Sequence, residues 1–256
     1  MLITLLGFIT GILMGLTGTG GGVLLTPLLL LFTPYHAVVV IGTDIVNGAA
    51  TKLLGVFEHR KLAQVRGRLA AFLVLGSVPG TLGGVLMVRL LKAHLQSGQL
   101  DHLLKQLLAL VLVGVGLTLP FVRQAHDSAA RALPDLGRTR ERLRLVVVGA
   151  LVGFLVALTS IGSGSLLMVF LLALFPLPLG ELVGTDLLFG LATMALAGAL
   201  HLGMGHFDGA LFVRLALGSL PGVVIGARLT RLIPERYFSW LFTVLYFSLG
   251  ARLLVG

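Results

Sequence analysis

The sequence contains no cysteine and few charged residues. With no cysteine among 256 residues, disulfide frameworks and thiolate metal sites are excluded. Charged residues make up only 11% of the chain, against about 25% in a typical soluble domain. Hydrophobic residues make up 57%, and the mean hydropathy is +1.05. So few charges cannot cover a surface that faces water, so we expect a protein embedded in a lipid bilayer.

Negative charge is also scarce, and the formal net charge is +9. In a soluble protein this excess would indicate a nucleic-acid partner. Here, however, the basic residues cluster in the connections between apolar segments, a placement that marks cytoplasmic loops of membrane proteins. We therefore expect no nucleic-acid partner. The clustered residues are Arg60, Lys61, Arg66 and Arg68, and then Arg138, Arg140, Arg142 and Arg144.

The chain contains an internal duplication. Gly42-Thr43-Asp44 recurs as Gly184-Thr185-Asp186, at an offset of 142 residues. The same ungapped offset relates His59 to His201, and Gly76-Ser77 with Pro79-Gly80 to Gly218-Ser219 with Pro221-Gly222. Similar composition alone does not keep an aspartate and a histidine in register. We therefore expect a first membrane repeat at 1–122, a basic cytoplasmic linker at 123–144 and a second repeat at 145–256.

Each repeat is expected to contain five apolar segments, of which the first two are too short to span. A crossing helix needs about 17–25 residues. Glycine-rich stretches at 17–22 and 159–165 separate the two short segments, and glycine there breaks the helix. Each short pair is therefore expected to form a re-entrant or half-helix hairpin. The expected segments are 2–16, 23–33, 37–57, 69–91 and 103–122, then 145–159, 165–175, 179–203, 210–232 and 237–255.

The distribution of basic residues predicts that the two repeats have opposite orientations. The connection 58–68 is basic, whereas its counterpart 200–213 contains no Lys or Arg. Opposite charge bias at equivalent loops requires an odd number of crossings per repeat. The expected fold is an all-α polytopic membrane protein of two inverted repeats, each a hairpin plus three full transmembrane helices. Secondary transporters share this plan and bind solute at the repeat interface.

The two glycine-rich tips are the first candidate binding site. A half-helix that begins at Gly22 or Gly164 inside the membrane presents free N–H groups and its positive dipole end, which favour an anion. The alternative is that these small residues only allow close helix packing. The candidate substrate-binding residues are Thr17, Thr19, Gly20, Gly21 and Gly22 in the first tip, and Thr159, Ser160, Gly162, Ser163, Gly164 and Ser165 in the second.

Asp44 and Asp186 are the acids deepest inside the predicted spans. Buried acids in membranes are costly and usually functional, so we expect these two to carry protons in a transport cycle. The alternative is a structural role, in which each protonated acid bonds to a helix end or a backbone carbonyl. Lys52 lies two turns beyond Asp44 and is expected to extend to the cytoplasmic side; the alternative is that it attracts an anion. The neighbours expected to share the site are Thr43, Asn47 and Thr185.

The glycine motifs resemble a known family. The run from Gly7 to Leu28, with Thr17-Gly18-Thr19-Gly20-Gly21-Gly22 at its centre, is similar to the opening signature of the TauE/SafE family of sulfite exporters. The two Gly-Thr pairs and Gly76-Ser77-Val78-Pro79-Gly80, with its copy at 218–222, match as well, so the resemblance covers nearly the whole chain. The family positions that this sequence matches are Gly20, Gly21, Gly22, Thr43, Gly162, Gly164 and Thr185.

The resemblance implies a multi-pass permease of the cytoplasmic (cell inner) membrane for sulfite, sulfoacetate or other organosulfonates, in most members an exporter. A serine commonly follows the Gly-Thr pair in that family, where this chain has Asp44 and Asp186. These acids either couple transport to protons or favour a cationic or neutral substrate.

The sequence as a whole predicts a secondary transporter that exports a small sulfur-containing anion. No catalytic constellation, metal-ligand cluster or cofactor motif is visible, so we expect neither an enzyme nor a metal or cofactor. The alternatives are a passive anion channel and a permease for a different small solute. Small-residue faces leave room for a homodimer.

Overall fold

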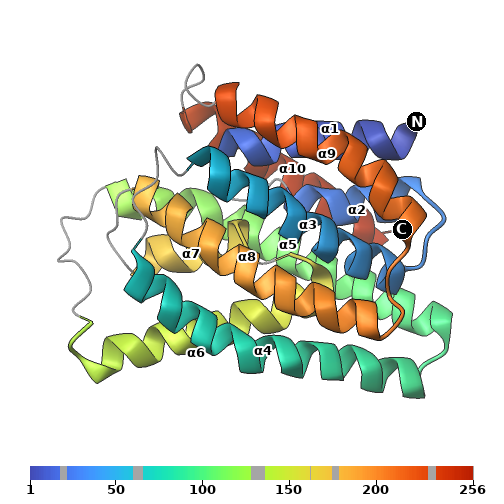
Figure 1. Cartoon of the computed structure of the whole chain (residues 1–256), viewed down its shortest axis with the longest axis horizontal. Helices are drawn as coiled ribbons and strands as arrows, with labels where there is room; N and C mark the ends of the chain where they lie inside the picture. The colour runs from blue at the N-terminus through green and yellow to red at the C-terminus, as the bar shows by residue number, and fades with distance from the viewer. Residues whose placement is uncertain are drawn as a thin grey trace.

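The chain folds as a bundle of helices (Figure 1). The computed structural model describes residues 1–17, 22–59, 66–127, 136–161, 163–174, 179–229 and 235–255. Within these ranges it contains α-helices and no strand. The helices are α1 (Leu2–Thr17), α2 (Gly22–Phe32), α3 (Ala37–His59), α4 (Gly67–His94), α5 (Ser97–Asp127), α6 (Thr139–Thr159), α7 (Ser165–Leu174), α8 (Leu179–Gly203), α9 (Gly209–Leu229) and α10 (Glu235–Val255).

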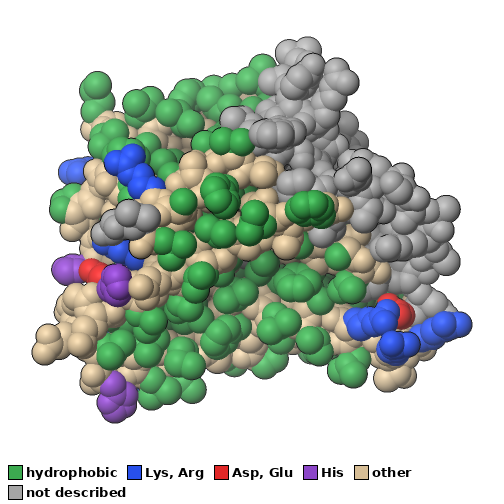
Figure 2. All heavy atoms as spheres, turned by 180° about the vertical axis from the view of Figure 1, so that it is seen from behind, with side chains coloured by type: hydrophobic (Ala, Val, Ile, Leu, Met, Phe, Trp, Pro, Cys, Tyr) green, Lys and Arg blue, Asp and Glu red, His purple; other side chains and the backbone are tan. Residues whose placement is uncertain are grey.

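Six helices in the described part of the chain are long and apolar enough to cross a membrane: α3, α4, α5, α6, α8 and α9. Figure 2 shows the corresponding surface, on which apolar side chains cover the middle of the molecule while charged side chains gather at its two ends. An apolar face of this kind matches a bilayer interior, where charged side chains are costly. The expected class, an all-α polytopic membrane protein, is confirmed.

The prediction that the segment before the second tip is short was wrong. That segment was expected at 145–159, but α6 begins at Thr139 and has 21 residues. The arginine-rich stretch continues as helix because its charges have local partners. Arg144 pairs with Glu141 at 2.8 Å, and the Arg142 guanidinium lies 5.7 Å from the centre of the Phe72 ring. The other three short segments, α1, α2 and α7, have 16, 11 and 10 residues.

Helices of the two repeats pack against each other in equivalent pairs. α1 packs along α9, and α6, its duplicate, packs along α4, the duplicate of α9 (Figure 1). Each repeat thus presents its first helix to the fourth helix of the other repeat. Between these pairs, α3 lies against its own duplicate α8, and α5 against its duplicate α10. The interface between the repeats therefore runs through the middle of the molecule.

Glycines set the distance between the helices in the pairs α1–α9 and α4–α6. A Cβ built on Gly11 would lie 2.4 Å from the carbonyl oxygen of Ser219, and one on Gly80 would lie 2.0 Å from that of Ala150. Glycines therefore stand where two backbones touch, as in the small-residue contacts of membrane helices. The same holds for Gly7, Gly15, Gly76 and Gly84 and for their partners Gly149, Gly153, Gly218, Gly222 and Gly226.

Equivalent helices run in opposite directions at the centre. Gly48 of α3 faces Met194 of α8, whereas Gly55, further along α3, faces Leu187, which comes earlier in α8. The antiparallel arrangement of α3 and α8 is the relation that inverted repeats require. The orientation of the repeats relative to a bilayer stays a prediction, as do the domain limits at 122 and 145.

We predict that Gly80→Ala destabilises the protein, because the new methyl group would collide with the backbone of α6. Overpacking of this kind costs about 1–3 kcal/mol, and the expected result is a melting temperature lower by roughly 3–10 °C. Thermal unfolding in detergent measures the effect. Gly114→Ala in α5 is the matched control, since nothing lies within 4 Å of the new Cβ. Equal melting temperatures for the two variants would contradict the proposed backbone contact.

Candidate functional site

Buried polar side chains gather where the broken helix α6–α7 meets α3 and α8. Both aspartates expected from the sequence are in this polar cluster, with exposed fractions of 2% for Asp44 and 0% for Asp186. The cluster also contains one buried lysine and several hydroxyls. Buried polar residues on these helices and on α2 are Thr26, Thr43, Asp44, Asn47, Lys52, Thr159, Ser160, Ser163, Ser165, Thr185 and Asp186.

The second tip is a real break between two helices. α6 ends at Thr159, and Ser160 then adopts the left-handed conformation with φ of 61° while its N–H donates to the carbonyl oxygen of Val156 at 2.8 Å. Ile161 N–H donates to Thr159 Oγ1 at 3.2 Å. Gly164 has φ of 110°, a conformation that suits glycine, and α7 begins at the next residue. The expected break is therefore present on this side, and it separates a helix of spanning length, α6, from the short helix α7.

Asp186 accepts hydrogen bonds from two donors of different chemistry. Lys52 Nζ lies 2.8 Å from its Oδ2, and the backbone N–H of Gly164 donates to its Oδ1 at 2.6 Å. The lysine and aspartate side chains are both fully buried. An ammonium group and a helix N-terminus thus converge on one carboxylate.

The expectation that Lys52 extends to the cytoplasmic side was wrong. The residue is only 1% exposed, and its chain passes over Gly190 of α8. A Cβ at Gly190 would lie 2.4 Å from Lys52 Cε, so the end of the lysine side chain lies directly against this glycine. A lysine within an otherwise apolar predicted span was the sequence signal for its burial, but no signal identified Asp186 as its partner.

Asp44 has different partners from Asp186. The hydroxyl of Thr26, from α2, donates to Asp44 Oδ2, and the hydroxyl of Ser160 donates to the same oxygen at 2.9 Å. No cationic side chain contacts Asp44 in the described ranges. Thr26 was not predicted, since its duplicate position is Met168 and the repeat gave no signal. The two equivalent acids are therefore held by hydroxyls in one repeat and by an ammonium in the other.

The polar neighbours of the aspartates bond elsewhere. Thr43 Oγ1 accepts the N–H of Asp208 at 3.0 Å, and Asn47 Oδ1 accepts the hydroxyl of Ser219 at 2.8 Å. The hydroxyl of Thr185 donates to the carbonyl oxygen of Glu181 at 2.7 Å. Thr43 and Asn47 thereby tie α3 to the start of α9 and to its interior, whereas Thr185 bonds within α8.

The remaining predicted tip residues divide into two groups. Ser163, with 2% exposure, has a hydroxyl with no hydrogen-bond partner in the described chain, and Ser165 is buried at the first residue of α7. Gly22 is the first residue of α2, and Thr17 is the last residue of α1. The side chain of Thr17 and all of Thr19, Gly20, Gly21 and Gly162 lie outside the described residues.

A row of hydrogen-bonded polar side chains lies at the C-terminal end of α8. His201 Nε2 donates to the carbonyl oxygen of Ala157 at 3.0 Å, and His201 Nδ1 lies 3.2 Å from His206 Nδ1. Lys92 Nζ lies 3.1 Å from His206 Nε2. Burial, then the charge of Lys92 and then His201, lower the pKa of His206, in the α8–α9 connection, to about 4. His206 is therefore neutral near neutral pH and can accept a hydrogen bond from Lys92.

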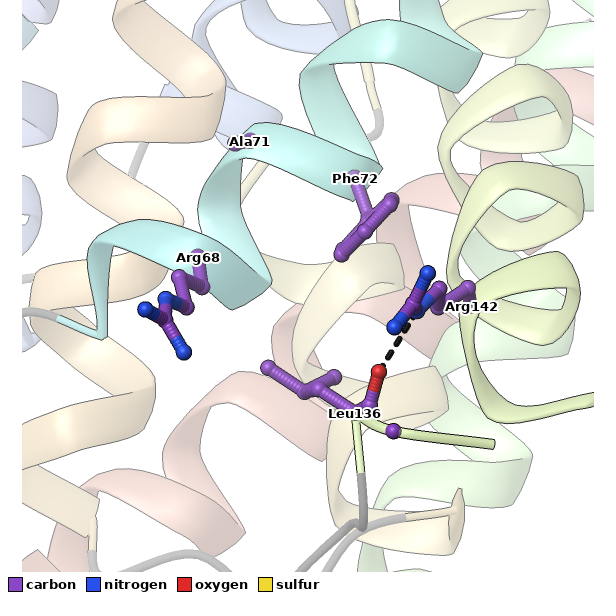
Figure 3. Close-up of a pocket in the computed structure, with 6 residues that line it drawn as sticks. Arg68, Ala71, Phe72, Leu136 and Arg142 are labelled. Carbon is purple, nitrogen blue, oxygen red and sulfur yellow. Dashed lines mark hydrogen bonds between the residues drawn. The ribbon is translucent and has the colours of Figure 1, made fainter. Parts of the chain in front are cut away.

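A basic groove opens at the other end of the molecule, where α4 and α6 begin (Figure 3). It has a volume of about 620 Å³ and is lined by Arg68, Ala71, Phe72, Leu136, Gly137 and Arg142. Arg142 Nε donates to the carbonyl oxygen of Leu136 at 2.5 Å, which fixes the guanidinium beside the groove. Nearby, Arg66 pairs with Glu181 of α8. This groove is open and positively charged.

Three comparisons place the chain among known proteins. The model of the family described as "Sulfite exporter TauE/SafE" matches residues 3–253. The chain is also similar to probable membrane transporter proteins of Bacillus subtilis (strain 168): YjnA, 32% identical with 98% of both chains covered, and YdhB, 26% identical with 92% of both covered. YunE of the same organism is 23% identical, with 99% of this chain and 97% of its own covered. No solved structure matches.

We predict that either single variant of the buried ion pair destabilises the protein more than the double variant does. Lys52→Met leaves a buried carboxylate without its cation, and Asp186→Asn leaves a buried ammonium without its anion, each at a cost of about 3–5 kcal/mol. The double variant removes both charges. Thermal unfolding in detergent of the four proteins measures the coupling. Strictly additive effects would show that the two side chains do not interact.

Proposed function

The chain belongs to the TauE/SafE family of membrane transporters, and from this premise we propose that it carries small sulfur-containing anions across the cytoplasmic membrane. The proposed substrates are sulfite, sulfoacetate and other organosulfonates, and the proposed direction is export. As a multi-pass membrane protein with six candidate spans, it has enough crossings to enclose a solute path between its repeats.

The ammonium of Lys52 beside the start of α7 is the observation that carries this proposal. A fully buried cation is rare in a membrane helix and marks a substrate or ion path. Gly164 adds a backbone donor at 2.6 Å from Asp186, and Ser163 adds a hydroxyl without a partner among the described residues. A sulfonate or sulfite oxygen accepts hydrogen bonds from these same groups.

The basic groove at the start of α4 and α6 is a second observation that favours an anionic substrate. Arg68 and Arg142 line it, and it opens on the end of the molecule that the charge distribution predicts to be cytoplasmic. Clefts lined by one sign of charge raise the local concentration of the opposite ion. We propose that this groove attracts the anion before it enters the bundle.

Coupling to protons is the finer part of the proposal. A carboxylate without a cation is costly inside a membrane, and Asp44 receives only hydroxyl donors from Thr26 and Ser160 in the described chain. Asp186 keeps its charge only while Lys52 stays beside it. Both acids can therefore bind a proton when their surroundings change, and both lie between helices of different repeats.

We predict saturable, proton-linked flux when the purified protein is reconstituted in liposomes with sulfite or sulfoacetate gradients and an internal pH dye. Asp44→Asn and Asp186→Asn are expected to alter the pH dependence of that flux, because each removes one site for a proton. Flux without saturation would indicate a passive channel. Absence of flux with any sulfur anion, at a protein density where a control transporter works, would contradict the proposed substrate class.

A further inference from the structure

Two equivalent side chains at the interface between the repeats pack alike but differ in charge. Lys52 and Met194 occupy equivalent positions in α3 and α8, and so do Gly48 and Gly190. Lys52 lies over Gly190, and Met194 lies over Gly48, where a Cβ would be 2.6 Å from Met194 Sδ. Two long side chains of similar length thus cross the interface in opposite directions, and only one of them carries a charge.

The charged side chain determines how the two acids differ. Asp186 is opposite Lys52 and accepts its ammonium at 2.8 Å, whereas Asp44, its duplicate, accepts hydroxyls. Both donors to Asp186, an ammonium and an N–H at the start of a helix, are groups that bind free anions in proteins. The carboxylate of Asp186 therefore occupies a position suited to the anionic group of a substrate.

We propose that Asp186 is an internal counter-ion that a substrate anion displaces from Lys52 and Gly164, and that Asp186 takes up one proton as it is displaced. The inference rests on the proposed transport of anions. One proton from solution joins a carboxylate oxygen of Asp186, and no other bond changes. One negative charge beside Lys52 is replaced by another, so a monovalent substrate leaves the net charge of the cluster unchanged.

Electrostatic repulsion prevents the substrate anion and a charged Asp186 from lying beside Lys52 at the same time. Two negative groups beside a single ammonium repel each other strongly where the effective dielectric constant is low. A bound anion together with a charged Asp186 would leave one buried charge unpaired, which is costly. The anion and the proton are therefore expected to bind together and to cross in the same direction. Efflux would then be driven by the gradient of the anion itself and would carry protons out with it.

The surroundings of Asp186 contain no competing partner among the described side chains. On α8, Glu181 pairs with Arg66, and His201 lies in the last turn. Helix α7 has no titratable group. On α3, Asp44 accepts hydrogen bonds from hydroxyls, so it does not compete with Asp186 for Lys52. The side chains of Glu58 and His59 at the end of α3 are outside the description. Other titratable groups of helices packed on α8 lie near helix ends: Arg68, Arg89, Lys92 and His94 on α4, and Arg140, Glu141, Arg142 and Arg144 on α6.

The experiment measures proton uptake on anion binding by the purified full-length protein. Methanesulfonate, a monovalent sulfonate, is added near neutral pH in weakly buffered detergent solution with a pH dye, and binding is followed by thermal stabilisation. The wild-type protein is expected to take up about one proton for each anion bound. Nitrate, which is also monovalent, serves as a further probe, so the exchange is tested even if sulfonates are not substrates.

Three variants test the assignment. Asp186→Asn is expected to bind the anion without proton uptake, with an affinity at least about tenfold higher near neutral pH and independent of pH. Lys52→Met is expected to lose binding. The double variant Lys52→Met with Met194→Lys moves the ammonium to the equivalent position, where Met194 already fits over Gly48. Proton uptake should then shift away from Asp186. Met194→Leu is the unchanged control.

The inference is overturned if wild-type protein binds any of these anions without proton uptake, or binds none of them. It is also overturned if Lys52→Met keeps wild-type affinity and proton uptake. These results are distinct from failure of the proposed function. Saturable sulfonate flux without proton uptake would leave the transporter standing and remove the counter-ion role. Proton-linked binding of nitrate without sulfonate flux would keep the counter-ion role and contradict the proposed transport of sulfonates.

Discussion

Close contact between helix backbones is the constraint on which the other features of this protein depend. Inside a bilayer, apolar side chains gain little by packing against one another instead of lipid, so helices associate through close packing and hydrogen bonds. Here glycines such as Gly11 and Gly80 allow the backbone of one repeat to touch that of the other. The resulting pairs, α1 with α9 and α4 with α6, join the two repeats and enclose α3 and α8 between them.

α3 and α8 carry both acids and the lysine because they are the most buried of the six candidate spans. Broken backbone and ionised side chains are tolerated at membrane depth only where protein or a cavity covers them. The tip between α6 and α7 meets this condition, since its exposed donors are used by neighbours: Ser160 bonds Asp44, and Gly164 bonds Asp186. The break in the helix and the buried acids thus satisfy each other's hydrogen bonds.

The sequence predicted the helices and both acids because these leave local signals. Apolar length and the glycine breaks gave the segments, and the Gly-Thr-Asp repeat gave Asp44 and Asp186. Pairings across the interface leave no such signal. Lys52 was expected at the membrane surface because distance along α3 does not show that Gly190 opens space on α8. Thr26 was missed since its duplicate is Met168, and α6 was expected to be too short because its arginines looked like a loop.

Duplication explains how one interface can hold two unlike acids. After two copies fuse, equivalent positions can change independently while the backbone contacts that join them are kept. The Lys52–Gly190 and Met194–Gly48 contacts preserve one packing arrangement with and without a charge. An ammonium beside only one of two acids gives that acid a counter-ion and leaves the other with neutral donors. A symmetric scaffold thereby acquires one position at which a carboxylate faces an ammonium, while the duplicate position has no such partner among the described residues.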